Sequence, residues 1–477
     1  MKDSKLMQVL ACMRPGERQD FGRFVELYAP ADAARLWALI SSLTEDTQAD
    51  AWDKTRLFAA LYPGQVYQDK VLRTRMSQLF GLLQDYLAWL ELRQRPWQRD
   101  LLALAQLRQR RADAVFVKQL HALGRKLDDQ PLRDATYSFA AFELAAEANG
   151  YYGQQAVRTP DDSLTRKLFH LDAWYLAQKL KESCEWLNRR QVFAPSADNP
   201  LLDELLRYLR EAGHPFWEVP AVRIYYQIAR CLTEEQDDSH YTTLVGLLHD
   251  FHGCFLADEV RDMYKHAQNY CIRRINAGRY TYLQALFSLY LRQLETGVIY
   301  QEGLLAHTDF KNIVTAGLRL GQHAWVAGFM ETQRERVPLP HRDNVYAFSL
   351  ASCYFEQGEA QKAIRLLQSV GFTDVYYALS ARHLLLKIFY EQMDVEGGLY
   401  QAASLATFVR RQQELAPRQR QQHLGFLRLY KKLLRLRERY HLAPDPAAAQ
   451  QLLDKLHRSA QIANLDWLKE KTEALTR

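Results

Sequence analysis

Residues 68–94 read QDKVLRTRMSQLFGLLQDYLAWLELRQ, and their apolar pattern decides the fold class. Apolar residues recur there at alternating spacings of four and three, at Leu72, Met76, Leu79, Leu83, Tyr86 and Leu90. This spacing places them on one face of a helix, as in helices that pack against other helices. The pattern therefore predicts one long helix over 68–94 that organises the N-terminal region.

Helical periodicity continues along nearly the whole chain, and helix-breaking residues divide it into segments. Proline cannot continue the helical hydrogen-bond ladder, and glycine permits a left-handed cap. Such breaks fall at Pro15-Gly16, Pro30, Pro63-Gly64 and Pro131. Because alternating β-type runs between hairpin turns are absent, the sequence predicts an all-α fold.

Length and composition describe a folded chain of more than one core. At 477 residues the chain exceeds the size at which a single core usually stops growing, so several domains or a stack of repeats is expected. Hydrophobic residues make up 48% and charged residues 25%, which are ordinary values for a folded protein. The net charge of +6, from 62 basic and 56 acidic residues, is too small to mark the whole chain as a nucleic-acid binder.

The start of the chain and its cysteines predict a cytoplasmic location. Residues 1–5 lead into an amphipathic stretch rather than an apolar signal region, and the leucine-rich segments carry polar residues too often to span a membrane. The six cysteines form no Cys-x-x-Cys pair. In a reducing compartment this pattern predicts buried thiols and no disulfides.

A short motif recurs in the C-terminal half. Residues 354–359, YFEQGE, are echoed by 389–394, FYEQMD, thirty-five residues later, and more faintly by 317–322, GLRLGQ, thirty-seven residues earlier. A period of this length is typical of a helix-turn-helix repeat.

On these residues, the stretch 307–412 resembles tetratricopeptide repeats (TPRs). In that family small residues let two helices approach closely, an aromatic residue fills the wedge, and glycine makes the turn. The middle unit fits with Ala351, Tyr354, Gly358 and Ala363.

The neighbouring units depart from the TPR pattern. The earlier unit keeps Gly321 at the turn but has Val314 and Val326 where small residues are usual, and the third has Leu386 and Met393 at the small and turn positions. The whole chain also resembles a set of large, uncharacterised helical bacterial proteins, a resemblance that implies a fold and no activity.

These patterns predict four parts. They are an N-terminal helical bundle over 1–150, a degenerate helical-repeat region over 151–306, TPR-like repeats over 307–412, and C-terminal capping helices over 413–477. The first boundary lies in a predicted loop around 150–163. We expect a right-handed TPR-like α-solenoid with a basic helical cap after the bundle.

The register of the repeats predicts a partner-binding groove. On the concave face it places Lys311, Thr315, Phe348, Ser352, His383 and Lys387. Such a groove accepts an extended or helical peptide, and the two lysines are compatible with an acidic ligand. The asparagines that TPR families use to clamp a terminal carboxylate are missing at these positions. The alternative is that this face packs on the chain's own C-terminal helices.

A basic stretch follows the repeats. Residues 410–439 hold ten Arg or Lys and two acids, and Arg428, Lys431, Arg435 and Arg439 recur on one helical face. A row of cations favours polyanions such as nucleic acid through counterion release. The alternatives are a solvated charged cap and, less favoured, a membrane-surface helix.

A second nucleic-acid hypothesis concerns the start of the 68–94 helix, where Asp69, Lys70, Arg73 and Arg75 follow a proline-glycine turn. A helix entered in this way can read a major groove. The continuous apolar seam argues against it, because most long packed helices with an arginine-rich start are not DNA readers.

Catalytic and metal-binding motifs are lacking. There is no phosphate loop, His-Glu-x-x-His or Gly-x-Ser-x-Gly elbow. His249, His252 and Cys254 are the best metal-like cluster, but no carboxylate or second cysteine stands at ligand spacing. Glu143 and Glu147 lie four apart, as many surface carboxylates do. The sequence therefore predicts a non-enzymatic scaffold or adaptor without a cofactor or metal, with a nucleic-acid-contacting regulator as the alternative and an enzyme third.

Overall fold

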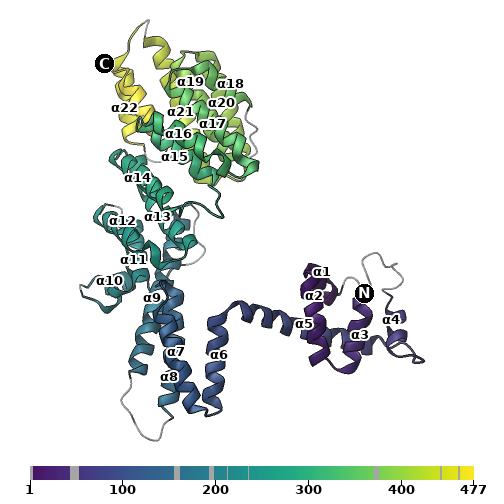
Figure 1. Ribbon diagram of the computed structural model, residues 1–477. Coiled ribbons are helices and arrows are strands. Elements are labelled where there is room, and N and C mark those ends of the chain that lie inside the picture. The colour runs from purple at the N-terminus through teal and green to yellow at the C-terminus, as the bar shows by residue number, and fades with distance from the viewer. Residues whose placement is uncertain are drawn as a thin grey trace. The chain divides into compact units, whose positions relative to one another are not determined.

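The computed structural model describes residues 4–42, 53–154, 162–192, 198–211, 213–234, 236–369, 375–440, 443–459 and 462–476. Over these ranges the chain forms twenty-three α-helices and no strand, so the predicted all-α class is confirmed (Figure 1). One isolated bridge joins Gln301 and Leu304.

The chain divides into two compact units. The first comprises Met1–Lys126 and Glu143–Ser163, and the second Leu127–Phe142 and Leu164–Arg477. The helices α7 (Asp113–Asp128) and α8 (Ala135–Tyr152) each contribute to both units. Of the predicted loop at 150–163, residues 150–152 are helical and 155–161 lie outside the described part of the chain.

The long helix of the first unit is the one that the apolar pattern predicts. Its six described helices before α7 are α1 (Lys5–Cys12), α2 (Pro15–Tyr28), α3 (Ala31–Ser41), α4 (Lys54–Leu61), α5 (Asp69–Gln94) and α6 (Pro96–Gln109). On α5, Leu72, Leu79, Leu83 and Tyr86 are buried against α1 to α4. The Tyr86 hydroxyl donates to the carbonyl of Glu17, 3.2 Å away, and so ties α5 to α2.

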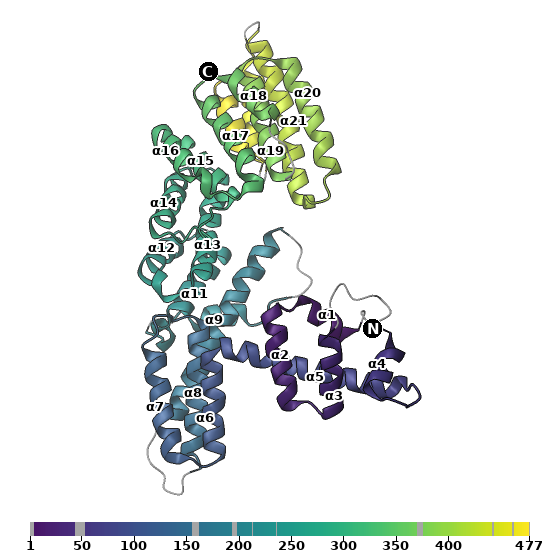
Figure 2. The same cartoon turned by 45° about the vertical axis from the view of Figure 1, so that its right-hand side comes forward.

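The second unit is a succession of helices. Its first part contains α9 (Ser163–Val192), α10 (Leu202–Tyr208), η2 (Pro215–Glu218), α11 (Pro220–Thr233), α12 (Ser239–Phe251), η3 (His252–Cys254), α13 (Ala257–Asn276) and α14 (Thr281–Thr296). Its second part contains α15 (His307–Arg319), α16 (His323–Gln333), η4 (Arg334–Arg336), α17 (Leu339–Glu356), α18 (Ala360–Ser369), α19 (Val375–Glu391), α20 (Val395–Arg411), α21 (Pro417–Tyr440), α22 (Pro446–His457) and α23 (Leu465–Glu473). The helices α17 to α21 lie side by side (Figures 1 and 2).

One turn geometry recurs between consecutive helices of the second unit. Gly278, Gly321, Gly358 and Met393 have φ of +87°, +71°, +77° and +61°, the left-handed cap that ends a helix. After each, a backbone amide bonds back to the carbonyl five residues earlier, as in Glu359 to Tyr354 at 2.8 Å and Asp394 to Phe389 at 3.0 Å. The residues predicted as turns therefore make turns, and helices α13 to α20 are repeat-like hairpins.

The close approach in the α15–α16 hairpin involves a small residue outside the predicted small positions. The sequence has Val314 and Val326 where small residues are usual. The structure places Gly317 against Val326, and a Cβ on Gly317 would lie 2.5 Å from the Val326 Cγ2 atom. The small residue is therefore present, one helical turn later.

Candidate partner-binding groove

A cavity of about 620 Å³ lies among α13, α15, α17, α19 and α21. All six residues of the predicted groove line this cavity. Three of the helices supply two each, four positions apart: Lys311 and Thr315 from α15, Phe348 and Ser352 from α17, and His383 and Lys387 from α19. Residues four apart share one helix face, so three parallel pairs converge on this cavity. We call this cavity the groove.

The two predicted lysines differ in their surroundings. The Lys311 ammonium lies 3.4 Å from the Ser380 hydroxyl and 5.1 Å from the centre of the Tyr377 ring, so other groups of the chain already hold it. Lys387 is partly buried, and its ammonium lies 5.8 Å from the centre of the Trp467 ring. Among the described residues, no carboxylate lies within 4 Å of the Lys387 ammonium.

Burial and, after it, the nearby positive charge of Arg319 together lower the pKa of Lys387 to about 8. Arg319 ends α15, is exposed and lines the same groove. Sequence reasoning missed it because the predicted register counted only the middle of α15. The groove therefore combines two cations that act on one another, and Glu356 is the acid among its lining residues.

A hydrogen-bonded pair of histidines forms the base of the groove. The Asn464 side-chain amide lies 3.2 Å from Nδ1 of His383, and Nε2 of His383 lies 2.9 Å from Nδ1 of His423. An amide nitrogen only donates, so Nδ1 of His383 accepts this hydrogen bond. Nε2 of His383 then carries the hydrogen and donates it in a hydrogen bond to Nδ1 of His423. Both rings are thus neutral, in agreement with the burial that lowers the pKa of each.

Three amide side chains also line the groove, although the sequence shows none at the expected positions. They are Asn276 at the end of α13, Asn312 beside Lys311, and Asn464 before α23. Two of the three come from outside 307–412, so no reading of the repeat register could have found them. The alternative that this face packs on the C-terminal helices holds for its α19 part: the His383 ring packs on Phe426 of α21, and Lys387 lies beside Trp467 of α23.

The basic helix α21 is amphipathic, as predicted, with a wider apolar face. Leu427, Tyr430 and Leu434 are buried, and so are Phe426, Leu429 and Leu433. Arg428, Arg435 and Arg439 are exposed and Lys431 is partly buried. None of these four cations forms an ion pair within the described parts of the chain, whereas Arg437 lies 3.3 Å from Glu391.

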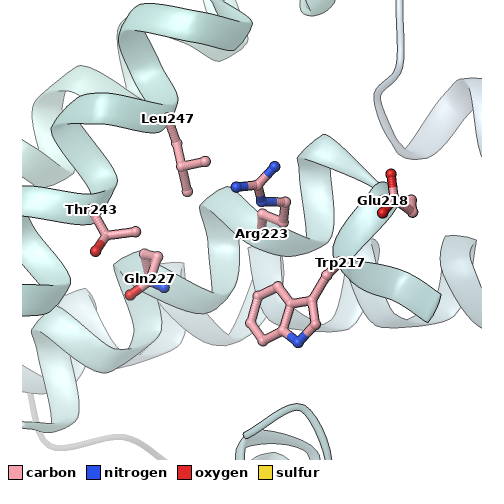
Figure 3. A pocket seen from close by; sticks show the side chains of 6 residues that line it. All are labelled: Trp217, Glu218, Arg223, Gln227, Thr243 and Leu247. Carbon is pink, nitrogen blue, oxygen red and sulfur yellow. The ribbon is translucent and has the colours of Figure 1, made fainter. Parts of the chain in front are cut away.

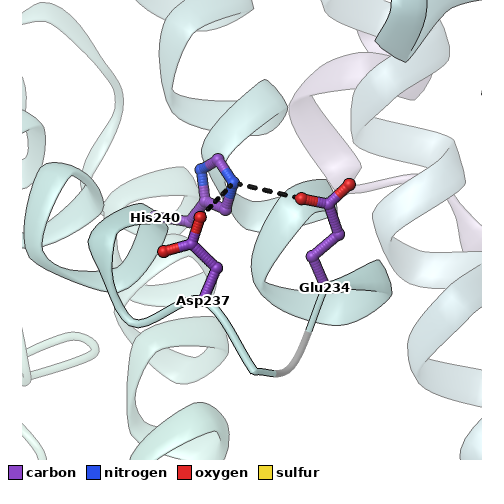
Figure 4. A group of neighbouring side chains, drawn as sticks. All are labelled: Glu234, Asp237 and His240. Carbon is purple, nitrogen blue, oxygen red and sulfur yellow. Dashed lines mark ion pairs between the residues drawn. The ribbon is translucent and has the colours of Figure 1, made fainter.

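The metal-like histidines do not converge on a common point. The His249 and Arg292 side chains are in contact, and His252 bonds through Nδ1 to the carbonyl of His249, 3.0 Å away. Over the described ranges, one other group brings ligand atoms together: Glu234, Asp237 and His240 (Figure 4). The buried Arg230 pairs with Glu234 and lies 3.4 Å from Nε2 of His240, so a guanidinium already neutralises this group.

A second hollow of about 410 Å³ lies between η2, α11 and α12 (Figure 3). Its polar side chains already contact other parts of the chain. Gln227 lies 2.8 Å from His240, Trp217 donates to the carbonyl of Glu211 at 3.2 Å, and the Arg223 guanidinium lies 5.3 Å from the Phe251 ring centre. The groove is therefore the stronger candidate.

The remaining candidates are held by structural contacts. Arg75 lies 2.9 Å from Asp32 and bonds to the Tyr62 hydroxyl, and the exposed Arg73 pairs with Asp69 at 2.6 Å. Of the basic residues proposed for a recognition helix, Lys70 is then the one without an ion pair among the described residues. Glu147 pairs with Arg108 at 2.8 Å, and burial raises the pKa of Glu143.

No family model, curated protein or solved structure matches this chain. In the described ranges, no helix is both long and apolar enough to cross a bilayer.

Proposed function

We propose that this chain is a non-enzymatic scaffold or adaptor that holds a segment of a partner protein in the groove. The observation that carries the proposal is the convergence of six residues, chosen from repeat register alone, on a single cavity. The recurrent hairpins support a TPR-like α-solenoid, an architecture whose concave faces serve as peptide sites. The six thiols are free, which supports a cytoplasmic setting. The expectation that they are buried holds for Cys184, Cys231 and Cys271 and is wrong for the exposed Cys12.

Capture of partner proteins tests this function. The double variant Lys311→Glu and Lys387→Glu places acids on two walls of the groove, and we expect it to lose specific partners recovered from a nuclease-treated lysate of the native host. The double variant Lys118→Glu and Arg125→Glu on α7 is the matched control, because it reverses two exposed charges outside the groove and outside α21. Far-UV circular dichroism verifies that all variants fold. If the folded Lys311→Glu and Lys387→Glu double variant still captured the same partner proteins, the groove would not be the partner-binding site.

A second candidate function rests on α21. Three exposed arginines and Lys431 follow one helix without ion pairs in the described structure, an arrangement that favours a polyanion such as nucleic acid. Binding of a labelled DNA duplex or a labelled RNA hairpin, measured by fluorescence anisotropy, should then weaken steeply as the salt concentration rises. The double variant Arg435→Glu and Arg439→Glu should abolish this binding. Salt-independent binding, or none, excludes this candidate.

A further inference from the structure

Two cations that line the groove lack an ion-pair partner among the described residues. Lys387 on α19 and Arg319 at the end of α15 both line it, and neither forms an ion pair within the described residues. By contrast, Arg437 and Lys471, which lie close by in the same core, both pair with Glu391 at 3.3 and 3.0 Å. Glu391 is thus committed to other cations, and Glu356, which lines the groove, acts on Lys387 from beyond ion-pair distance.

Holding two unpaired cations near one another in a partly buried site costs free energy. Burial removes water from the Lys387 ammonium, and Arg319 repels it, so its pKa falls to about 8. Glu356 of α17 and Glu470 of α23 offset this effect in part, and Lys471 adds to it. A bound anion would relieve both costs, because a charge-assisted hydrogen bond is strongest where water is excluded.

We propose that the groove selects an acidic peptide segment, with a carboxylate of the peptide bound between Lys387 and Arg319. This inference rests on the proposed function, since it names the chemistry of the partner. Asn312, Thr315 and Ser352 lie on the same walls; the Thr315 and Ser352 hydroxyls donate to the carbonyls of Lys311 and Phe348 at 2.8 and 3.0 Å, so they can only accept from a peptide amide. Phe348, Leu379 and Leu384 also line the groove, but they are buried in the chain's own core and offer a peptide little apolar surface.

The surroundings of Lys387 and Lys311 suit them differently for binding a peptide carboxylate. The Lys311 ammonium already contacts the Ser380 hydroxyl and the Tyr377 ring. Lys387 has an aromatic neighbour, Trp467, and no acid within ion-pair distance among the described residues. The charge of Lys387 should therefore decide ligand choice, and that of Lys311 should matter less.

Selection from a random dodecapeptide library displayed on phage tests the proposal with the full chain as bait. The expected result is a pool enriched in Asp and Glu from the wild type, and loss of that enrichment with Lys387→Met. A pool without acidic enrichment would overturn this inference and leave the proposed function standing. Selection of no peptide at all would overturn both the inference and the proposed function. If the chain then bound free citrate, the ligand of the groove would be a small anion and not a peptide.

Calorimetry of one selected peptide then assigns the residues. Lys387→Met and Arg319→Met should each weaken binding by about tenfold or more, as expected for loss of one charge-assisted contact. Lys387→Arg should retain most of the affinity. Lys311→Met, and Lys432→Met on α21, should change it by less than about threefold, and thermal melts verify folding. Equal losses from Lys311→Met and Lys387→Met would contradict the assignment.

Discussion

Gly317 shows how one missing side chain sets the distance between two helices. It lies on α15 opposite the fully buried Val326 of α16, and a Cβ there would approach a Val326 methyl to 2.5 Å. Valine is stiff about its first side-chain torsion, so it cannot turn away without cost. The hairpin that carries Lys311 and Thr315 into the groove therefore depends on glycine at this position.

Gly317→Ala should lower stability by about 1–3 kcal/mol, as overpacking of a core does. Gly328→Ala on α16 is the matched control, because a Cβ added there would meet no atom within 4 Å, and alanine should stabilise the helix slightly. Thermal unfolding of the two variants measures the difference. Equal melting temperatures would show that the α15–α16 contact is looser than the structure has it.

Because His266 is buried, we expect the folded chain to lose stability in mild acid. Its Nδ1 lies 3.3 Å from the Asn188 amide, and burial lowers its pKa to about 4 from an ordinary value of 6.5. The unfolded chain therefore takes up the proton first, so the contribution of His266 is complete above about pH 6.5 and is lost as the pH falls towards 4. Up to about 3 kcal/mol of stability is at stake in that window.

The measurement is the melting temperature of the wild type and of His266→Gln between pH 7.5 and 4.5. The variant should show a shallower decline, whereas the exposed His323→Gln should follow the wild type. Parallel curves for all three proteins would mean that His266 is protonated equally in both states.

At the scale of elements, the hairpin turns share one left-handed backbone geometry, but the residue at the turn is not always glycine, which this geometry favours. Gly321 and Gly358 suit a positive φ, but the third turn uses Met393 at +61°. A non-glycine residue in this conformation costs about 1–2 kcal/mol. The turn survives because the flanking helices α19 and α20 are packed, and Asp394 caps α20 through the amide of Gly397 at 2.8 Å.

Exchanging the turn residues should therefore act in opposite directions. Gly358→Ala should destabilise the chain by about 1 kcal/mol through the backbone alone, since no atom surrounds that position within 4 Å. Met393→Gly should not lower stability, because relief of the backbone offsets the lost side-chain packing. Denaturant titration measures both, and a neutral Gly358→Ala would contradict the left-handed assignment.

Elements could be predicted where the signal is local. The seam of Leu72 to Leu90 predicted a helix over 68–94, and α5 spans Asp69–Gln94. The turns at Gly321, Gly358 and Met393 were also predictable, because proline, glycine and periodicity act within a few residues. Val326, one of the two predicted small positions of the α15–α16 unit, does lie at the contact, but its partner Gly317 was not predicted, since which residue faces the partner helix depends on a crossing angle that periodicity does not give.

At the scale of the whole molecule, the groove could be predicted only in part. The six residues on α15, α17 and α19 followed from a single repeat register. Asn276, His423 and Asn464 did not, because they reach the groove from outside the repeats through packing of the second unit. The difference between Lys311 and Lys387 was equally hidden, since it depends on Ser380, Tyr377 and Trp467 in three dimensions.

The central claim is that the groove is the surface that a partner protein occupies. A photo-crosslinking residue, p-benzoyl-phenylalanine, placed at the exposed Thr315 in cells of the native host tests it directly, with Tyr400 on α20, which is 78% exposed and outside the groove, as the control position. We predict a discrete adduct from Thr315 that disappears when Lys387→Glu is added, and none of that mass from Tyr400. An adduct from Tyr400 alone, or one from Thr315 that persists with Lys387→Glu, would contradict the claim.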